Sequence, residues 1–357
     1  MEPKIKKYDL LIKNGTVHTA VESFESEIGV SEGKIAAIGK NLGHSERIID
    51  AKGLLVLPGG IDAHCHIEQE SSSKIMTADD FYSGSVSAAF GGNTTILPFA
   101  AQHRGQSLRD VVANARKRAK DKAVIDYGLH LIISDPSKSV LEDELPSLIK
   151  EGYTSFKVYM TYEMLKINDG EILDILALAR KYGALTMVHA ENNEIINWIS
   201  DRLTQRGYNA PKFHAVSHSH IAESEASRRA IDLARLVDAR MLIVHVSDAE
   251  AANSILQARN NELNIYGETC PQYLFLTAKD LDQEGMEGAK YCCSPPPRDK
   301  ESQKAIWKGL KNGTFQVFSS DHAPYRLDKS GKFHAGRDAS FNKIANGVPG
   351  LETRMPL

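Results

Sequence analysis

The chain has 357 residues, of which 42% are hydrophobic and 25% are charged, so it can bury a large core, and no apolar run approaches the length of a membrane span. Its formal net charge of −3 provides no basic field that would attract nucleic acid or anionic lipid, so neither is expected as a partner. The first apolar run is too short for a signal peptide and the four cysteines form no CxxC pair, which together favour a cytoplasmic protein.

The first 55 residues predict a small β-sandwich segment without helices. Turn signals at Asn14-Gly15 and Glu32-Gly33 separate short runs of strand character. These runs cover residues 8–12, 16–19, 27–30 and 34–38.

Residues 56–357 predict a second domain, in which apolar strands alternate with amphipathic helices as in parallel βα units. Eight strands are expected, at residues 61–66, 94–100, 125–133, 155–161, 185–191, 241–247, 264–270 and 315–321. Helices are expected between them, at residues 77–90, 107–120, 140–151, 171–182, 222–237, 248–259 and 301–310. Such repeats indicate an α/β fold of the (β/α)8, or TIM, barrel type. A doubly wound sheet is the alternative, but it usually has fewer strands and a glycine-rich phosphate turn, which this sequence lacks.

Three connections of this barrel are expected to lie at its active-site mouth. The segment 192–221 is long, and we expect it to form a loop that overhangs the mouth. The loops 67–76 and 161–168 are expected to shape the pocket, but their sequences identify no particular substrate.

The first barrel strand ends in Asp62-Ala63-His64-Cys65-His66. Side chains two residues apart on a strand face the same side, so His64 and His66 can both reach one metal ion, whereas Cys65 points away from them. This pattern alone is a weak signal, because histidines are common at strand ends. Ligand-type residues also fall in the C-terminal part of four further strands, at Lys157, His189, His245 and Asp321. Because the carboxyl ends of barrel strands carry the active site, these residues together predict a metal centre.

Lys157 lies between Phe156 and Val158, where a charged ammonium group would be costly to bury. A neutral amine can add carbon dioxide, and the two oxygens of the resulting carbamate can bridge two metal ions. A buried lysine paired with a carboxylate such as Asp321 is the alternative. Zinc suits a site of imidazoles and carboxylates, although manganese or cobalt would fit the same ligands.

These six residues, in this order on strands one, four, five, six and eight, resemble the amidohydrolase superfamily. The segments 155–162, 268–273, 293–296 and 346–350 are similar to those of dihydropyrimidinases and D-hydantoinases. The resemblance implies a homotetramer with two divalent metal ions bridged by N6-carboxylated Lys157. It places His64, His66 and Asp321 on the more buried ion, and His189 and His245 on the other.

The resemblance also implies the reaction, which opens the cyclic amide ring of dihydropyrimidines or 5-substituted hydantoins to give N-carbamoyl amino acids. Asp321 would take the proton of the attacking water and pass it to the leaving nitrogen. Tyr162 matches a tyrosine that hydrogen-bonds the oxyanion. Ser294 and Asn346 match positions whose main-chain groups bind the ureide edge of the ring.

Three rival functions differ from this one at particular residues. Dihydroorotases use an arginine directly after the HxH motif, but here Ile67-Glu68-Gln69-Glu70 follows it, and its acidic residues are expected to repel a substrate carboxylate. Allantoinase is the closest alternative, although Tyr162 and Ser294-Pro295-Pro296 favour the hydantoinase branch. Non-catalytic scaffold relatives have lost their metal ligands, whereas this chain retains all six.

Relatives usually continue past the segment 350–357 that ends this chain. We therefore expect the barrel domain to be truncated at its C-terminus relative to the family. The sandwich begun by residues 1–55 would be completed by a C-terminal part that is absent here.

Overall fold

The computed structural model describes residues 7–71 and 74–357, so residues 1–6 of the expected sandwich segment lie outside the described part. The chain divides into two compact units, Met1–Gly60 and Ile61–Leu357. The division lies after Gly60 rather than after residue 55, because β7 (Leu55–Val56) pairs with β2 (Leu10–His18) of the first unit.

The first unit is built around β2, which pairs antiparallel with β3 (Ser23–Ser31) and parallel with two short strands. The predicted turn at Glu32-Gly33 joins β3 to β4, with φ angles of 52° and 71°. The predicted break at Asn14-Gly15 is wrong, because Asn14 adopts a φ of 62° and forms a bulge within the continuous strand β2. The remaining strands are β1 (Lys7–Tyr8), β4 (Lys34–Gly39), β5 (His44–Ser45) and β6 (Ile48–Asp50).

The second unit confirms the predicted eight-stranded parallel barrel. Its strands follow the order β8-β9-β11-β12-β13-β14-β15-β16, and a bridge between Cys65 and His322 brings the chain after β16 back to β8. The expected strand 125–133 is interrupted after β10 and resumes as β11. The strands are β8 (Gly60–Cys65), β9 (Asn93–Ala101), β10 (Asp126–Tyr127), β11 (His130–Ile132), β12 (Ser155–Tyr159), β13 (Leu185–His189), β14 (Met241–Ile243), β15 (Ile265–Thr269) and β16 (Val317–Phe318).

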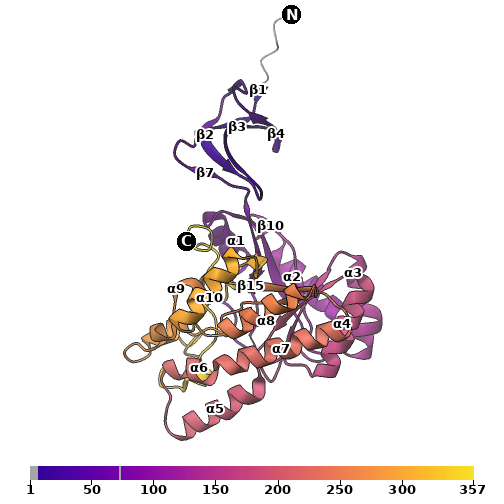
Figure 1. The fold of residues 1–357 in the computed structure, drawn as a ribbon, viewed down its shortest axis with the longest axis vertical. Coiled ribbons are helices and arrows are strands. Elements are labelled where there is room, and N and C mark those ends of the chain that lie inside the picture. Colours follow the sequence, from indigo (N-terminus) through magenta and orange to yellow (C-terminus); the bar gives the residue numbers. More distant parts are fainter. Residues whose placement is uncertain (1–6, 72–73) are drawn as a thin grey trace, which may run out of the picture. The chain divides into compact units, whose positions relative to one another are not determined.

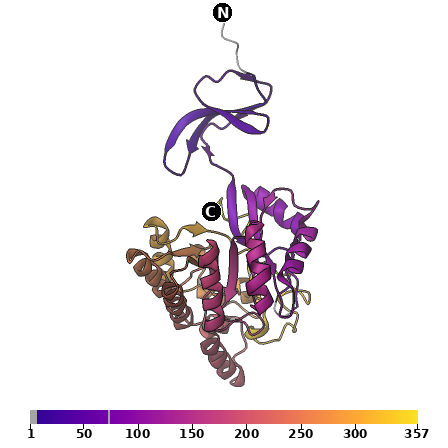
Figure 2. The same ribbon diagram turned by 90° about the vertical axis from the view of Figure 1, so that its right-hand side faces the viewer.

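Helices surround the strands of this unit, as the two ribbon views show (Figure 1 and Figure 2). Side chains cap several of them, for example Asn168, which accepts a hydrogen bond from the Glu171 N–H at the start of α4. The main helices are α1 (Phe81–Phe90), α2 (Leu108–Ala119), α3 (Leu145–Lys150), α4 (Asp169–Tyr182), α7 (His220–Leu236), α8 (Ala249–Asn260) and α10 (Lys300–Lys311). Shorter turns are η1 (Val140–Glu144), α9 (Gln272–Phe275), η2 (Ala278–Leu281), η3 (Glu287–Tyr291) and η4 (Phe341–Lys343).

The segment 192–221 was expected to be a loop, and that prediction is wrong. It forms α5 (Asn193–Gln205) and α6 (Lys212–Ser217). The Asn192 side chain accepts hydrogen bonds from the first free backbone N–H groups of α5, which stabilises the start of the helix.

Strand alternation on β12 determines which side chains reach the barrel interior. Phe156 and Val158 are fully buried and pack outward in the large cluster between strands and helices. Lys157 therefore faces inward, and its strand neighbours in register are Ile132 and Met187 of the interior cluster.

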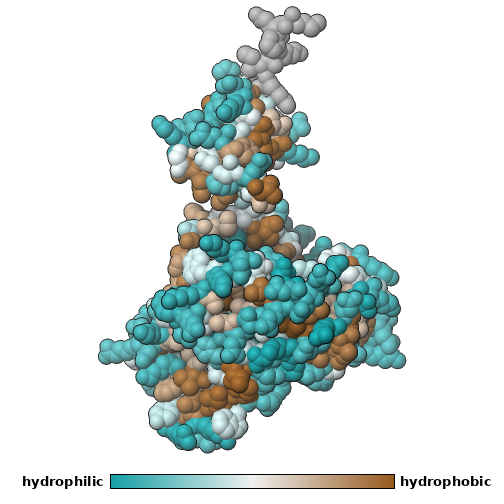
Figure 3. Space-filling view, viewed as in Figure 1, coloured by the Kyte–Doolittle hydropathy of each residue, from teal (hydrophilic) through white to brown (hydrophobic). Residues whose placement is uncertain are grey.

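Hydrophilic residues cover most of the surface that the space-filling view shows (Figure 3).

In the described part of the chain, no helix combines the length and the apolar character needed to cross a bilayer.

Candidate active site

A cavity of about 280 Å³ brings the predicted site residues together at the carboxyl ends of the barrel strands. His64 lies beside the cavity wall, fully buried, and contacts the cavity-lining Lys157. The other predicted residues line the cavity itself, namely His66, Lys157, Tyr162, His189, His245, Ser294, Asp321 and Asn346.

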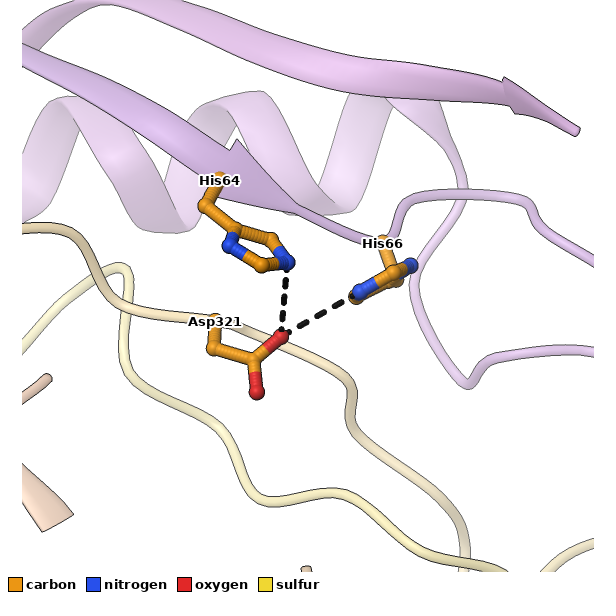
Figure 4. Close-up of side chains that lie close together, drawn as sticks. All are labelled: His64, His66 and Asp321. Atoms are coloured by element: carbon orange, nitrogen blue, oxygen red, sulfur yellow. Dashed lines mark ion pairs between the residues drawn. The ribbon is translucent and has the colours of Figure 1, made fainter. Parts of the chain in front are cut away.

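His64, His66 and Asp321 form one compact group (Figure 4). Asp321 Oδ1 lies 3.1 Å from His64 Nε2 and 3.2 Å from His66 Nε2. One ligand atom from each of the three residues lies within 4.8 Å of the others, which is compatible with a shared metal ion.

The hydrogen bonds of the two Nδ1 atoms determine whether the Nε2 atoms that face Asp321 carry a proton. His64 Nδ1 lies 2.7 Å from Glu268 Oε1, and His66 Nδ1 lies 2.8 Å from Gln69 Oε1. Both oxygens are acceptors, so each Nδ1 carries the proton and each Nε2 presents a lone pair. Two lone pairs directed at a carboxylate oxygen repel it, and a cation between them makes the arrangement favourable. The donor set therefore fits a metal ion.

Lys157, His189 and His245 form a second group next to the first. The rings of His189 and His245 lie 4.4 Å apart between centroids, and those of His64 and His245 lie 5.5 Å apart. His189 Nε2 donates to Glu191 Oε2 at 2.8 Å, which frees its Nδ1 for a ligand. Both ring nitrogens of His245 are buried and have no partner among the described residues. An unsatisfied buried imidazole is costly, so this group also fits a cation.

Lys157 forms no ion pair with a carboxylate among the described residues. Its Nζ lies 2.7 Å from His64 Nε2, and 4.8 and 5.0 Å from the ring centroids of Phe99 and Tyr159. Burial lowers the pKa of Lys157 to about 8, against the raising effect of the Asp321 and Glu268 charges. The neutral fraction of this amine near neutral pH is therefore larger than in an exposed lysine.

The site also favours neutral histidines and an ionised aspartate. Burial lowers the pKa of His64 and of His245 well below the usual value. Burial opposes ionisation of Asp321, but the positive charge that His64 and His66 carry when protonated, in the place of a cation, more than offsets it and holds the pKa of that carboxyl well below its usual range. Metal ions bind the deprotonated forms of these groups.

Tyr162 follows β12 and lines the same cavity as Lys157. Burial raises the pKa of its phenol, while hydrogen bonds with the side chains of Ser294 and Asn346 oppose that rise. Tyr162, His245 and Asp321 have φ angles of 68°, 41° and 46°, in the left-handed region that side chains rarely adopt. Such strain persists where the surrounding structure holds a functional group in place.

Three residues of the site were not predicted from the sequence. Glu191 is the last residue of the expected strand 185–191, and Glu268 lies two residues before the end of the expected strand 264–270, as His189 does in its own strand, so the criterion that selected His189 would have found them. Gln69 lies in a loop and carries no such signal.

The acidic residues after the HxH motif do not line the cavity as expected. Glu68 pairs with Lys122 at 3.1 Å and Glu70 lies 3.7 Å from His103, while Gln69 of the same segment faces the cavity. Repulsion of a substrate carboxylate by Glu68 and Glu70 therefore has no support in this geometry. Residues 72–73 of the loop expected to shape the pocket lie outside the described residues.

Comparisons with known proteins identify the family. Residues 55–349 match the Amidohydrolase family. The D-hydantoinase of Geobacillus stearothermophilus is 44% identical over 97% of this chain and 73% of its own length, and that of Rhizobium radiobacter is 43% identical over 97% and 75%. The crystal structure of dihydropyrimidinase from Brevibacillus agri superimposes with a TM-score of 0.92 at 42% identity, covering 97% of this chain and 74% of that one. The chain belongs to the amidohydrolase family, in the group of D-hydantoinases and dihydropyrimidinases, as the sequence motifs predicted.

Proposed function

We propose that this chain hydrolyses the ring amide bond of dihydropyrimidines or 5-substituted hydantoins, which gives N-carbamoyl amino acids. The observation that carries the proposal is the convergence of four histidines, Lys157 and Asp321 around one cavity from five barrel strands and the residues that follow them. Similar proteins named D-hydantoinase and dihydropyrimidinase support this substrate class, and the comparisons do not favour allantoinase.

Two divalent cations, for which zinc is the best match, belong to this proposal. His64, His66 and Asp321 would hold one, His189 and His245 the other, and carboxylated Lys157 would bridge them. When bound, such a pair supplies a water of lowered pKa and polarises the ring carbonyl.

Carboxylation of Lys157 needs no other residue to react. The neutral amine attacks carbon dioxide, an N–C bond forms, and one proton is released to leave a carbamate anion. The lowered pKa of Lys157 supports this step because only the neutral amine is nucleophilic. The carbamate would replace an unfavourable buried cation with an anion beside the bound cations.

The residues of the chain have separate tasks in the proposed reaction. Ionised Asp321 accepts the proton of the attacking water and delivers it to the leaving ring nitrogen. Tyr162 stays protonated at neutral pH and donates its O–H to the carbonyl oxygen as negative charge develops there. Ser294 and Asn346 orient that hydroxyl through their side chains, which leaves their main-chain groups for the ureide edge of the substrate.

A substrate panel tests the proposal. Zinc-loaded protein is assayed with dihydrouracil, hydantoin, allantoin and dihydroorotate, and we expect turnover of the first two. Turnover of dihydroorotate alone would overturn the assignment. From the family resemblance we further propose that the protein is cytoplasmic and forms a homotetramer. A molar mass of four chains, measured in solution by light scattering, would support the tetramer.

A further inference from the structure

We propose that Glu268 is a positioning residue that orients one histidine of each metal-binding group through a single carboxylate oxygen. This inference rests on the proposed metal-dependent function. It concerns Glu268, which is the last residue but one of β15 and is fully buried.

The contact with His64 sets the tautomer of that ring. Glu268 Oε1 accepts a hydrogen bond from His64 Nδ1 at 2.7 Å, across 204 residues of sequence. Because Nδ1 then holds the only ring proton, His64 Nε2 is committed to binding a ligand on the Asp321 side.

The contact with His245 holds the backbone conformation of that residue. The same Oε1 accepts a hydrogen bond from the His245 N–H at 3.0 Å, and the Glu268 carbonyl accepts one from the Val246 N–H at 2.8 Å. His245 follows the end of β14 in the left-handed region, at a φ of 41°. Glu268 thus holds the chain on both sides of the strained residue, whose ring nitrogens have no partner among the described residues.

The other supporting side chains each bond one ligand ring only. Gln69 Oε1 accepts from His66, in the first group, and Glu191 Oε2 accepts from His189, in the second. Glu268 alone of these three contacts residues of both groups. Its loss is therefore expected to affect both metal ions, whereas loss of the Gln69 side chain affects one.

The test compares metal affinities of Glu268→Gln, which keeps the shape of the side chain but replaces its carboxyl group with an amide, with those of Gln69→Ala. Zinc binding is measured by competition with a chelator, which resolves the two binding steps without any assay of turnover. We expect both steps to weaken by about 10- to 100-fold in Glu268→Gln and one step to weaken in Gln69→Ala. Gln316→Ala is the control. Gln316 Oε1 accepts a hydrogen bond from the N–H of Gly267, which lies on β15 next to Glu268, but the Gln316 side chain has no recorded contact with a histidine of the site.

Each outcome decides the question. If both steps of Glu268→Gln stay within about twofold of the unsubstituted protein, or if only one step weakens, the shared positioning role is wrong. Should Glu268→Gln fail to fold, nitrogen NMR of the unsubstituted zinc-loaded protein replaces it, and a His64 ring protonated at Nε2 instead of Nδ1 overturns the inference. If Glu268→Gln loses both ions but the unsubstituted protein turns over no cyclic ureide, the positioning role stands and the proposed function fails.

Discussion

Lys157 Nζ and His64 Nε2 lie 2.7 Å apart, although β9 and β11 separate the strands that carry them. The two side chains therefore meet across the barrel interior rather than along neighbouring strands. This contact joins the two metal-binding groups, so a change at residue 157 is expected to disturb both.

Replacement of the lysine tests the carbamate. Lys157→Ala should lose bound metal and activity together, because it removes the proposed bridge between the two groups. A short carboxylic acid such as acetate should restore part of both by supplying two oxygens at the vacated position. Metal content and turnover are measured with and without the acid. Full activity in Lys157→Ala without added acid would contradict the carbamate.

Tyr162→Phe tests the hydroxyl that we assign to the oxyanion. We expect kcat to fall by about 10²- to 10³-fold with little change in KM, because the hydrogen bond strengthens only as charge develops on the oxygen. The Phe ring keeps the packing of Tyr162 on His189, whose ring centroid lies 5.3 Å away. Steady-state kinetics with dihydrouracil measure the effect. A rise in KM at unchanged kcat would assign Tyr162 to ground-state binding instead.

His130 makes the stability of the folded chain sensitive to acid. Burial lowers the pKa of His130 from 6.5 to about 4. Between these two pH values the unfolded chain binds more protons than the folded one, so stability falls as the pH is lowered from 6.5 to 4. The contribution of this one group is up to about 3 kcal/mol.

Urea unfolding of the metal-free protein over this pH range measures the effect, with His130→Gln for comparison. The variant loses the contact of His130 Nδ1 with Ser155 Oγ and should be less stable at neutral pH. Its stability should nevertheless fall less steeply on acidification. Parallel pH curves for the two proteins would show that His130 does not titrate as described.

The barrel and the metal-binding residues were predictable because each signal is local. A strand with an inward-facing ligand at its end is visible in a short stretch such as Leu185–His189, and the barrel topology then brings such ends together. The family motifs around Lys157 and Ser294 added the substrate class.

Other features depend on contacts that a local pattern does not contain. Nothing near His64 in the sequence shows that Glu268 holds its Nδ1, because the two residues lie 204 positions apart. The Asn14-Gly15 sequence was read as a turn, because a residue in the left-handed region occurs in β-bulges as well as in turns. The length of the connection 192–221 suggested a loop, yet the cap by Asn192 and buried residues such as Ile196 make its first half helical.

Arg354 and Asp62 provide a test of how the barrel is closed. The guanidinium Nε lies 2.9 Å from Asp62 Oδ2, and both side chains are almost fully buried. Arg354 also donates to the carbonyls of Phe318, after which β16 ends, and Ile61 of β8, at 2.9 and 3.1 Å. It therefore connects the first and last strands, in addition to the isolated bridge between Cys65 and His322.

Arg354→Met should destabilise the fold by about 3–5 kcal/mol, because it leaves the Asp62 carboxylate buried without its cation. Urea unfolding measures the loss, and Arg180→Met is the control, since Arg180 forms an exposed pair with Asp238 that contributes about 0–1 kcal/mol. Adding Asp62→Asn to Arg354→Met should recover part of the loss, because the amide avoids the buried charge. Equal destabilisation by Arg354→Met and Arg180→Met would mean that the barrel does not depend on this buried pair for its closure.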